Sequence, residues 1–137
     1  MSIVENAVMN FKMKKYNCCQ AVICAYCEEY GIDDMSIFKM TEGFGLGMGG
    51  LKDTCGAVTG MFMAISMHNS VGDKQNPPKT KQETYAHIRE AAADFEAKNG
   101  SIYCRDLKAM KDGKQVVSCE ECVRTAAKYV EKYIKEH

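Results

Sequence analysis

Apolar residues recur at intervals of three and four along most of the chain, which is the spacing of α-helices that each bury one face. No segment alternates apolar and polar residues at the period of two that marks a half-buried strand. The chain has 137 residues, 46% of them hydrophobic, which is enough to bury one core. The pattern therefore predicts an all-α fold, a compact single domain over residues 1–137 with about five to six helices.

Capping residues and glycines divide the first half of this pattern into helices. A first helix breaks at an Asn17-x-x-Gln20 capping box, which starts a second helix that ends at Gly31. Asp33-Asp34 caps a third helix, and this helix stops at a glycine-rich loop over residues 43–50.

The second half begins with a helix from Cys55, predicted to be the central one. Its small residues would let a neighbouring helix approach closely; they are Gly56, Ala57, Gly60 and Ala64. Met61, Ile65 and Met67 are expected to fill the core beside them. Asn76-Pro77-Pro78 opens a long helix, Asn99-Gly100 closes it, and its apolar side carries Tyr85, Ile88, Ala92 and Phe95. A turn around Cys104 and a polar loop over residues 108–115 lead to a last helix from Cys119.

The charge balance narrows the choice of partners. Eighteen basic residues face eighteen acidic ones, so no net field favours nucleic acid or an anionic membrane. The amino terminus lacks the features of a secretory signal, and the most apolar stretch, residues 57–67, is shorter than the roughly 20 residues of a membrane span. We therefore expect a cytoplasmic protein. In a reducing cytosol its eight cysteines are not expected to form a permanent disulfide framework.

Four of these cysteines lie at predicted helix starts, close behind a residue that can cap the helix. The segments are Asn17-Cys18-Cys19-Gln20, Thr54-Cys55-Gly56-Ala57, Ser101-Ile102-Tyr103-Cys104 and Ser118-Cys119-Glu120-Glu121. Free backbone N–H groups and the positive end of the helix dipole stabilise a thiolate there. Thiolates attack disulfides and bind metals, so the pattern predicts redox or metal chemistry.

With these segments in order along the chain, the sequence resembles the small redox-active proteins of the C_GCAxxG_C_C family. The pattern reads Tyr16-Asn17-Cys18, then Gly43-Phe44-Gly45 and Cys55-Gly56-Ala57-Val58-Thr59-Gly60, then Gly100 to Leu107 around Cys104, then Cys119 before Val123. The resemblance implies a compact helical domain with a redox or metal-linked cysteine centre and no established substrate. It carries over as characteristic residues Cys18, Cys55, Cys104 and Cys119, with Cys122 as the alternative to Cys119.

Three interpretations of these thiols remain open. In the first, Cys18, Cys55, Cys104 and Cys119 ligate an iron–sulfur cluster or another soft metal in an electron-transfer module. Backbone N–H groups of the loop would then donate to the cluster; its glycines are Gly45, Gly47, Gly49 and Gly50. This interpretation is slightly preferred.

In the second interpretation the same four thiols work without metal in thiol–disulfide exchange or redox sensing. Cys55 is then the candidate nucleophile, and Arg105 supplies a positive charge beside Cys104. In the third, the thiols are inert packing groups of a structural domain. We expect packing for Cys24 and Cys27, whereas Cys19 and Cys122 can be spare ligands or resolving thiols. The sequence leaves open whether the protein is an enzyme, which donor or acceptor protein or small molecule it meets, and whether it forms a homodimer.

The remaining motifs in the sequence are weaker indications of function. Two CxxC pairs, Cys24–Cys27 and Cys119–Cys122, lie too far apart for a zinc ribbon, and neither is followed by the histidine that covalent c-type haem requires. The Gly45-x-Gly47-x-x-Gly50 run lacks the preceding strand of an NAD-binding fingerprint, so we expect a loop with positive φ angles. The histidines at 68, 87 and 137 are scattered along the sequence and are not predicted to form a site.

Overall fold

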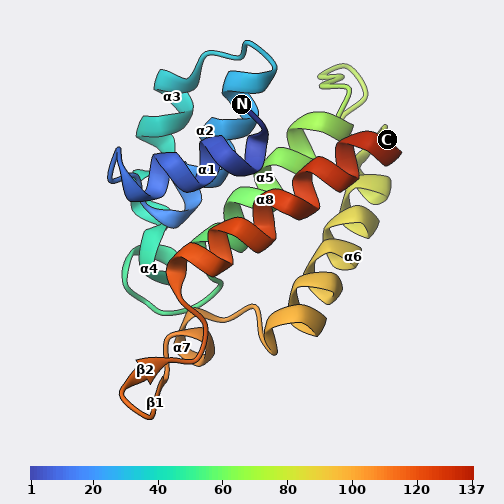
Figure 1. The fold of residues 1–137 in the computed structure, drawn as a ribbon. Coiled ribbons are helices and arrows are strands. Elements are labelled where there is room, and N and C mark those ends of the chain that lie inside the picture. The colour runs from blue at the N-terminus through green and yellow to red at the C-terminus, as the bar shows by residue number, and fades with distance from the viewer.

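All 137 residues are described by the structure, which is a computed structural model. Eight α-helices account for most of the chain, and a short 3-10 helix and a two-stranded hairpin complete it (Figure 1). The elements are α1 (Ile3–Lys12), α2 (Cys18–Glu29), α3 (Asp34–Met40), η1 (Glu42–Phe44), α4 (Gly45–Gly49), α5 (Gly56–Asn69), α6 (Lys81–Asn99), α7 (Cys104–Leu107), β1 (Met110–Lys111), β2 (Lys114–Gln115) and α8 (Cys119–Glu136).

The core lies between α2, α5 and α8. Ten of the twelve residues of α2 are buried, because this helix packs against α1, α5 and α8 at once. The long α8 crosses α1, α2 and α5, and α6 covers the remaining side of α5 and α8 (Figure 1). No helix combines the length and the apolar content needed to cross a lipid bilayer.

The predominantly helical fold is confirmed, but it has eight α-helices and not the expected five to six, because the short helices α4 and α7 form in the glycine-rich segment and at Cys104. Three further details differ from the expectation. The polar loop over residues 108–115 contains the antiparallel hairpin of β1 and β2, which the helical pattern did not predict. The long helix α6 begins at Lys81, because residues 76–80 form turns ahead of it. Met67 is 44% exposed and lies outside the core, whereas Met61 is fully buried as expected.

The helices α2 and α5 approach each other closely because two residues of α5 have no side chain. A Cβ added at Gly60 would lie 2.7 Å from the Cys19 carbonyl oxygen and 3.0 Å from Val22 Cβ. One added at Gly56 would lie 3.2 Å from Cys18 Cβ. Both glycines face α2, so any larger residue would push the two helices apart.

Gly60→Ala should lower the free energy of unfolding by up to about 2 kcal/mol. Alanine improves helix propensity by about 1 kcal/mol, but overpacking against a backbone oxygen that cannot move alone costs about 1–3 kcal/mol. Urea denaturation followed by circular dichroism measures the difference. Gly43→Ala is the matched control, since a Cβ there meets nothing within 4 Å and should change stability by less than about 0.5 kcal/mol. Equal stability of the two variants would show that the contact between α2 and α5 can accommodate an additional methyl group.

A thiol cluster where four helices begin

The four predicted cysteines lie at helix starts. Cys18, Cys104 and Cys119 are the first residues of α2, α7 and α8, and Cys55 is the residue that precedes α5. These placements confirm the expectation drawn from the capping pattern.

Two of the four expected caps are present. The Asn17 side chain accepts a hydrogen bond from the backbone N–H of Gln20 in a complete capping box, and Ser118 accepts one from Glu121. Thr54 and Ser101 do not cap α5 and α7. Thr54 instead forms a bridge with Tyr103, and this pairing aligns the segments that lead into the two helices.

Backbone hydrogen bonds hold Cys55 beside Cys104. The N–H of Cys55 donates to the Ile102 carbonyl at 2.8 Å, and the N–H of Cys104 donates to the Asp53 carbonyl at 2.6 Å. Cys55 also neighbours Cys18, because Gly56 lets α5 approach the first turn of α2. The structure thus brings Cys18, Cys55, Cys104 and Cys119 to one end of the bundle.

Within this cluster the thiols interact in two hydrogen-bonded pairs. Cys18 pairs with Cys119, and Cys55 pairs with Cys122. Both pairs join α8 to another helix, and no disulfide is formed. Cys122 is therefore a full member of the cluster, which the sequence left as an alternative. The available signal was its spacing: residues three apart on a helix lie on the same face, so Cys119 and Cys122 point the same way.

Each pair contains one acidic thiol and one that retains its proton. The hydrogen bond from Cys18 lowers the pKa of Cys119 to about 5, against the opposing effect of burial, with Lys108 adding to the shift. The hydrogen bond from Cys122 lowers the pKa of Cys55 to about 7, helped by the backbone N–H groups of Val58 and Ala57. The pKa values of Cys18 and Cys122 are raised by the hydrogen bonds they donate and by burial.

Lys108 supplies the positive charge of the cluster. Its ammonium group donates a hydrogen bond to Cys119 Sγ, and it forms no salt bridge with a carboxylate. Burial lowers the pKa of Lys108, but the thiolate of Cys119 and the nearby Cys18 and Cys104 outweigh burial and raise it above its ordinary value. The sequence does not identify this residue as functional, because nothing in the local pattern around residue 108 marks it.

Arg105 does not have the expected electrostatic role. Its guanidinium group stacks over Tyr103 and lies 4.0 Å from an Asp53 carboxylate oxygen. Burial raises the pKa of the neighbouring Cys104, whose thiol belongs to neither hydrogen-bonded pair.

The glycine-rich loop lies against Cys104 in a strained conformation. Leu46, Gly47 and Met48 have left-handed backbone angles inside the turn α4, an arrangement that costs roughly 1–2 kcal/mol for each residue other than glycine. A Cβ at Gly47 would lie 2.6 Å from Cys104 Cβ, so this close approach requires glycine. The predicted positive φ angles are present at Gly47, Gly49 and Gly50.

The thiols are not arranged as the ligand set of one metal ion. No group of three or more histidine, cysteine or carboxylate side chains is arranged to hold a metal ion. The thiols face each other in pairs, and a lysine cation contacts Cys119, where a ligand would need a free lone pair. In this arrangement the residues fit proton and disulfide chemistry better than a shared metal.

The other cysteines lie outside the paired thiols. Cys24 and Cys27 are buried along α2, and burial raises the pKa of each, to about 12 and about 11. Cys19 is buried too, with its thiol 3.9 Å from the Met63 sulfur.

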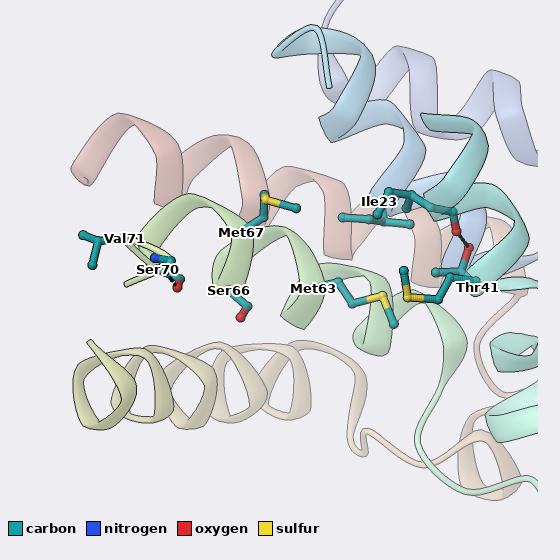
Figure 2. A pocket seen from close by; sticks show the side chains of 10 residues that line it. Ile23, Thr41, Met63, Ser66, Met67, Ser70 and Val71 are labelled. Atoms are coloured by element: carbon teal, nitrogen blue, oxygen red, sulfur yellow. Dashed lines mark hydrogen bonds between the residues drawn. The ribbon is translucent and has the colours of Figure 1, made fainter. Parts of the chain in front are cut away.

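A cavity of about 460 Å³ lies beside Met63, bounded by α2, α3 and α5. Figure 2 shows Met63, Met67, Ser66 and Ser70 along its wall. None of the residues that line it is ionisable, so the cavity offers no redox group.

The three histidines gather at the far end of α8, although the sequence scatters them. His68 Nδ1 lies 3.1 Å from the Tyr26 hydroxyl, and His87 Nδ1 lies 2.6 Å from the Tyr133 hydroxyl. The His137 ring packs against those of His87 and Tyr133. His68 and His87 are thus satisfied by tyrosine hydroxyls, as expected for histidines without a site role.

Lys108→Met should raise the pKa of Cys119. Losing a cation in contact with a thiolate raises the pKa by about 1 or more, so at about pH 4, below both pKa values, the alkylation rate of Cys119 should fall about tenfold. The pH dependence of iodoacetamide labelling, read by mass spectrometry of the Cys119 peptide, measures this. Lys111→Met is the control, because Lys111 is exposed in the hairpin. An unchanged labelling profile in Lys108→Met would contradict the assignment of Lys108.

The stability of the reduced protein should rise with pH between about 5 and 9. The pKa of Cys119 is about 5 in the folded protein against an ordinary value of 9.0, so the folded state binds fewer protons across this window. The stabilisation is complete above the ordinary pKa of 9.0 and is lost as pH falls through the pKa of about 5 in the folded protein. Urea unfolding at a series of pH values measures it. Cys119→Ser should flatten the slope, and an equally steep slope in that variant would contradict the assignment.

One family model matches most of the chain. The family described as "Putative redox-active protein (C_GCAxxG_C_C)" matches residues 16–133, a span that includes all the thiols of the cluster. An uncharacterized protein of Archaeoglobus fulgidus is 30% identical over 123 residues, covering 84% of this chain and 80% of that relative. No solved structure matches the chain significantly. The chain therefore belongs to the C_GCAxxG_C_C family.

Proposed function

We propose that this protein is a thiol–disulfide oxidoreductase whose exchange centre is the Cys18–Cys119 pair. One observation carries the proposal: the acidic thiol of Cys119 contacts both a protonated thiol and a lysine ammonium group. Cys119 is also the only cysteine that is not buried. A nucleophile needs access and thiolate character together, and Cys119 has both. This assignment replaces Cys55 as the attacking thiol, because Cys55 is only 1% exposed.

The reaction follows from the pair's geometry. The Cys119 thiolate attacks a disulfide of the substrate, which forms a mixed disulfide and releases one substrate thiolate. Cys18 then attacks Cys119 Sγ, which forms the Cys18–Cys119 disulfide and releases the second substrate sulfur. The Cys18 proton passes to a departing thiolate. Two electrons leave the protein dithiol, and the substrate disulfide becomes one thiol and one thiolate.

Lys108 stabilises the charged forms on this path. Its ammonium group contacts the Cys119 sulfur before attack and remains beside it when Cys119 is expelled from the disulfide in the reverse reaction. The partner is then a disulfide-bearing protein or small molecule. A reducing cytoplasm is the compartment that suits a chain with eight free cysteines.

An iron–sulfur cluster or other thiolate-bound metal is the second candidate. It is favoured by the convergence of Cys18, Cys55, Cys104 and Cys119, since four thiolates are the usual ligand set of such clusters. The pairwise arrangement and the absence of a ready ligand group weigh against it. The two candidates differ in metal content and in which disulfides form.

The deciding experiment begins with protein purified without oxygen and assayed for metal and acid-labile sulfide. We expect neither in stoichiometric amount, and we expect excess glutathione disulfide to convert Cys18 and Cys119 into a disulfide that peptide mapping identifies. Cys119→Ser should slow oxidation by glutathione disulfide at least about tenfold, because no other thiolate is accessible. Cys27→Ala is the control, since Cys27 lies outside the pairs and should leave the rate unchanged.

Stoichiometric iron and sulfide that disappear in Cys119→Ser would refute the metal-free mechanism and establish the cluster. Metal-free protein in which excess glutathione disulfide forms no disulfide at Cys119 would refute both the thiol–disulfide exchange function and the metal-binding function.

A further inference from the structure

The second thiol pair is sealed inside the protein. Cys55 and Cys122 are each 1% exposed, and their thiols form a hydrogen-bonded pair between α5 and α8. A disulfide partner in solution cannot reach either sulfur. Yet the pair is polarised like an exchange centre, with one thiol that donates and one that accepts the hydrogen bond.

The sealed pair adjoins the exposed one. Cys18 is the hydrogen-bond partner of Cys119, and it lies close enough to Cys55 and Cys122 for their charges to affect its pKa or theirs. The backbone places Cys55 near Cys18, because a Cβ added at the next residue, Gly56, would lie 3.2 Å from Cys18 Cβ. Cys18 is therefore the member of the outer pair that lies near the buried pair.

We propose that Cys55 and Cys122 form a second, internal dithiol that is oxidised only by exchange with the Cys18–Cys119 disulfide. The proposal rests on the proposed function, which supplies that disulfide. It assigns the family motif cysteine Cys55 to electron storage rather than to attack on the substrate. One protein molecule then delivers two electron pairs, one from each dithiol.

The exchange is balanced without an outside reagent. The Cys55 thiolate attacks Cys18 Sγ, which breaks the Cys18–Cys119 bond, forms a Cys18–Cys55 bond and expels the Cys119 thiolate. Cys122 next attacks Cys55 Sγ, forming the Cys55–Cys122 disulfide and expelling Cys18, which takes the Cys122 proton. The outer pair is thereby reduced and the inner pair oxidised, so Cys119 is ready for a second substrate.

Two physical effects favour this direction. Cys119 is a good leaving group, because its pKa is low and Lys108 stabilises its thiolate. The inner step also converts a buried thiolate at Cys55 into a neutral disulfide, which removes a charge from a poorly solvated place.

The test uses full-length reduced protein and glutathione disulfide, with acid quenching, alkylation and disulfide mapping. After one equivalent of oxidation, the disulfide should lie at Cys55–Cys122, and after two equivalents both pairs should be oxidised. Cys119→Ser should slow formation of the Cys55–Cys122 disulfide at least about tenfold. Cys122→Ser should trap the Cys18–Cys55 disulfide, because the resolving thiol is missing. Cys27→Ala is the control and should behave as the unaltered protein.

The outcomes separate the two proposals. If the Cys18–Cys119 disulfide forms and persists while Cys55 and Cys122 stay reduced, the relay is overturned and the proposed function stands. A Cys55–Cys19 disulfide, or inner oxidation as fast in Cys119→Ser as in the unaltered protein, would also overturn the relay. If no disulfide forms at Cys119 at all, the proposed function itself fails. Because Cys119→Ser and Cys122→Ser probe different steps, misfolding of one leaves the other decisive, with circular dichroism as the check on folding.

Discussion

The close packing of α2 against α5 determines where the thiols lie. Gly56 and Gly60 give α5 a face without side chains, so the first turns of the two helices meet and Cys18 comes to lie beside Cys55. The third helix, α8, crosses both of them and begins at the same end of the bundle. Its first turn carries Cys119 to Cys18 and Cys122 to Cys55. A family motif that reads as a catalytic signature is thus first a packing device, since its glycines create the contact that the cysteines need.

The paired thiols also solve an electrostatic problem. A thiolate in a poorly solvated place is costly unless hydrogen bonds or an opposite charge compensate it. At Cys119 a thiol proton, a lysine ammonium group and the start of an eighteen-residue helix all act on the sulfur. At Cys55 the compensation comes from a hydrogen bond with Cys122 and from backbone N–H groups, and the charge of Lys108 makes a smaller contribution. The more exposed thiol is therefore also the more acidic one.

Much of the fold could be predicted from the sequence, because its determinants are local. The Asn17-x-x-Gln20 box and the small residues of α5 act within a few positions of themselves, and both predictions were confirmed. The misses concern groups that meet only in the folded chain. Lys108 lies in an unremarkable polar segment and gains its role from Cys119, eleven residues away. Met67 fits a core periodicity but lies where α5 leaves the bundle's centre, next to the cavity of Figure 2.

The reactive sulfurs and their counter-charge are held by different kinds of structure. All four paired cysteines lie at the starts of helices that belong to the core, so their mutual positions are as rigid as the packing of α2, α5 and α8. Lys108 instead follows the four-residue α7 and precedes the small hairpin, a segment with few buried residues that projects from the bundle (Figure 1). Low local contact makes such a segment easier to displace than a core helix. The position of the Cys119 sulfur is therefore fixed by the core, whereas the charge that stabilises its thiolate is held by a segment outside the core.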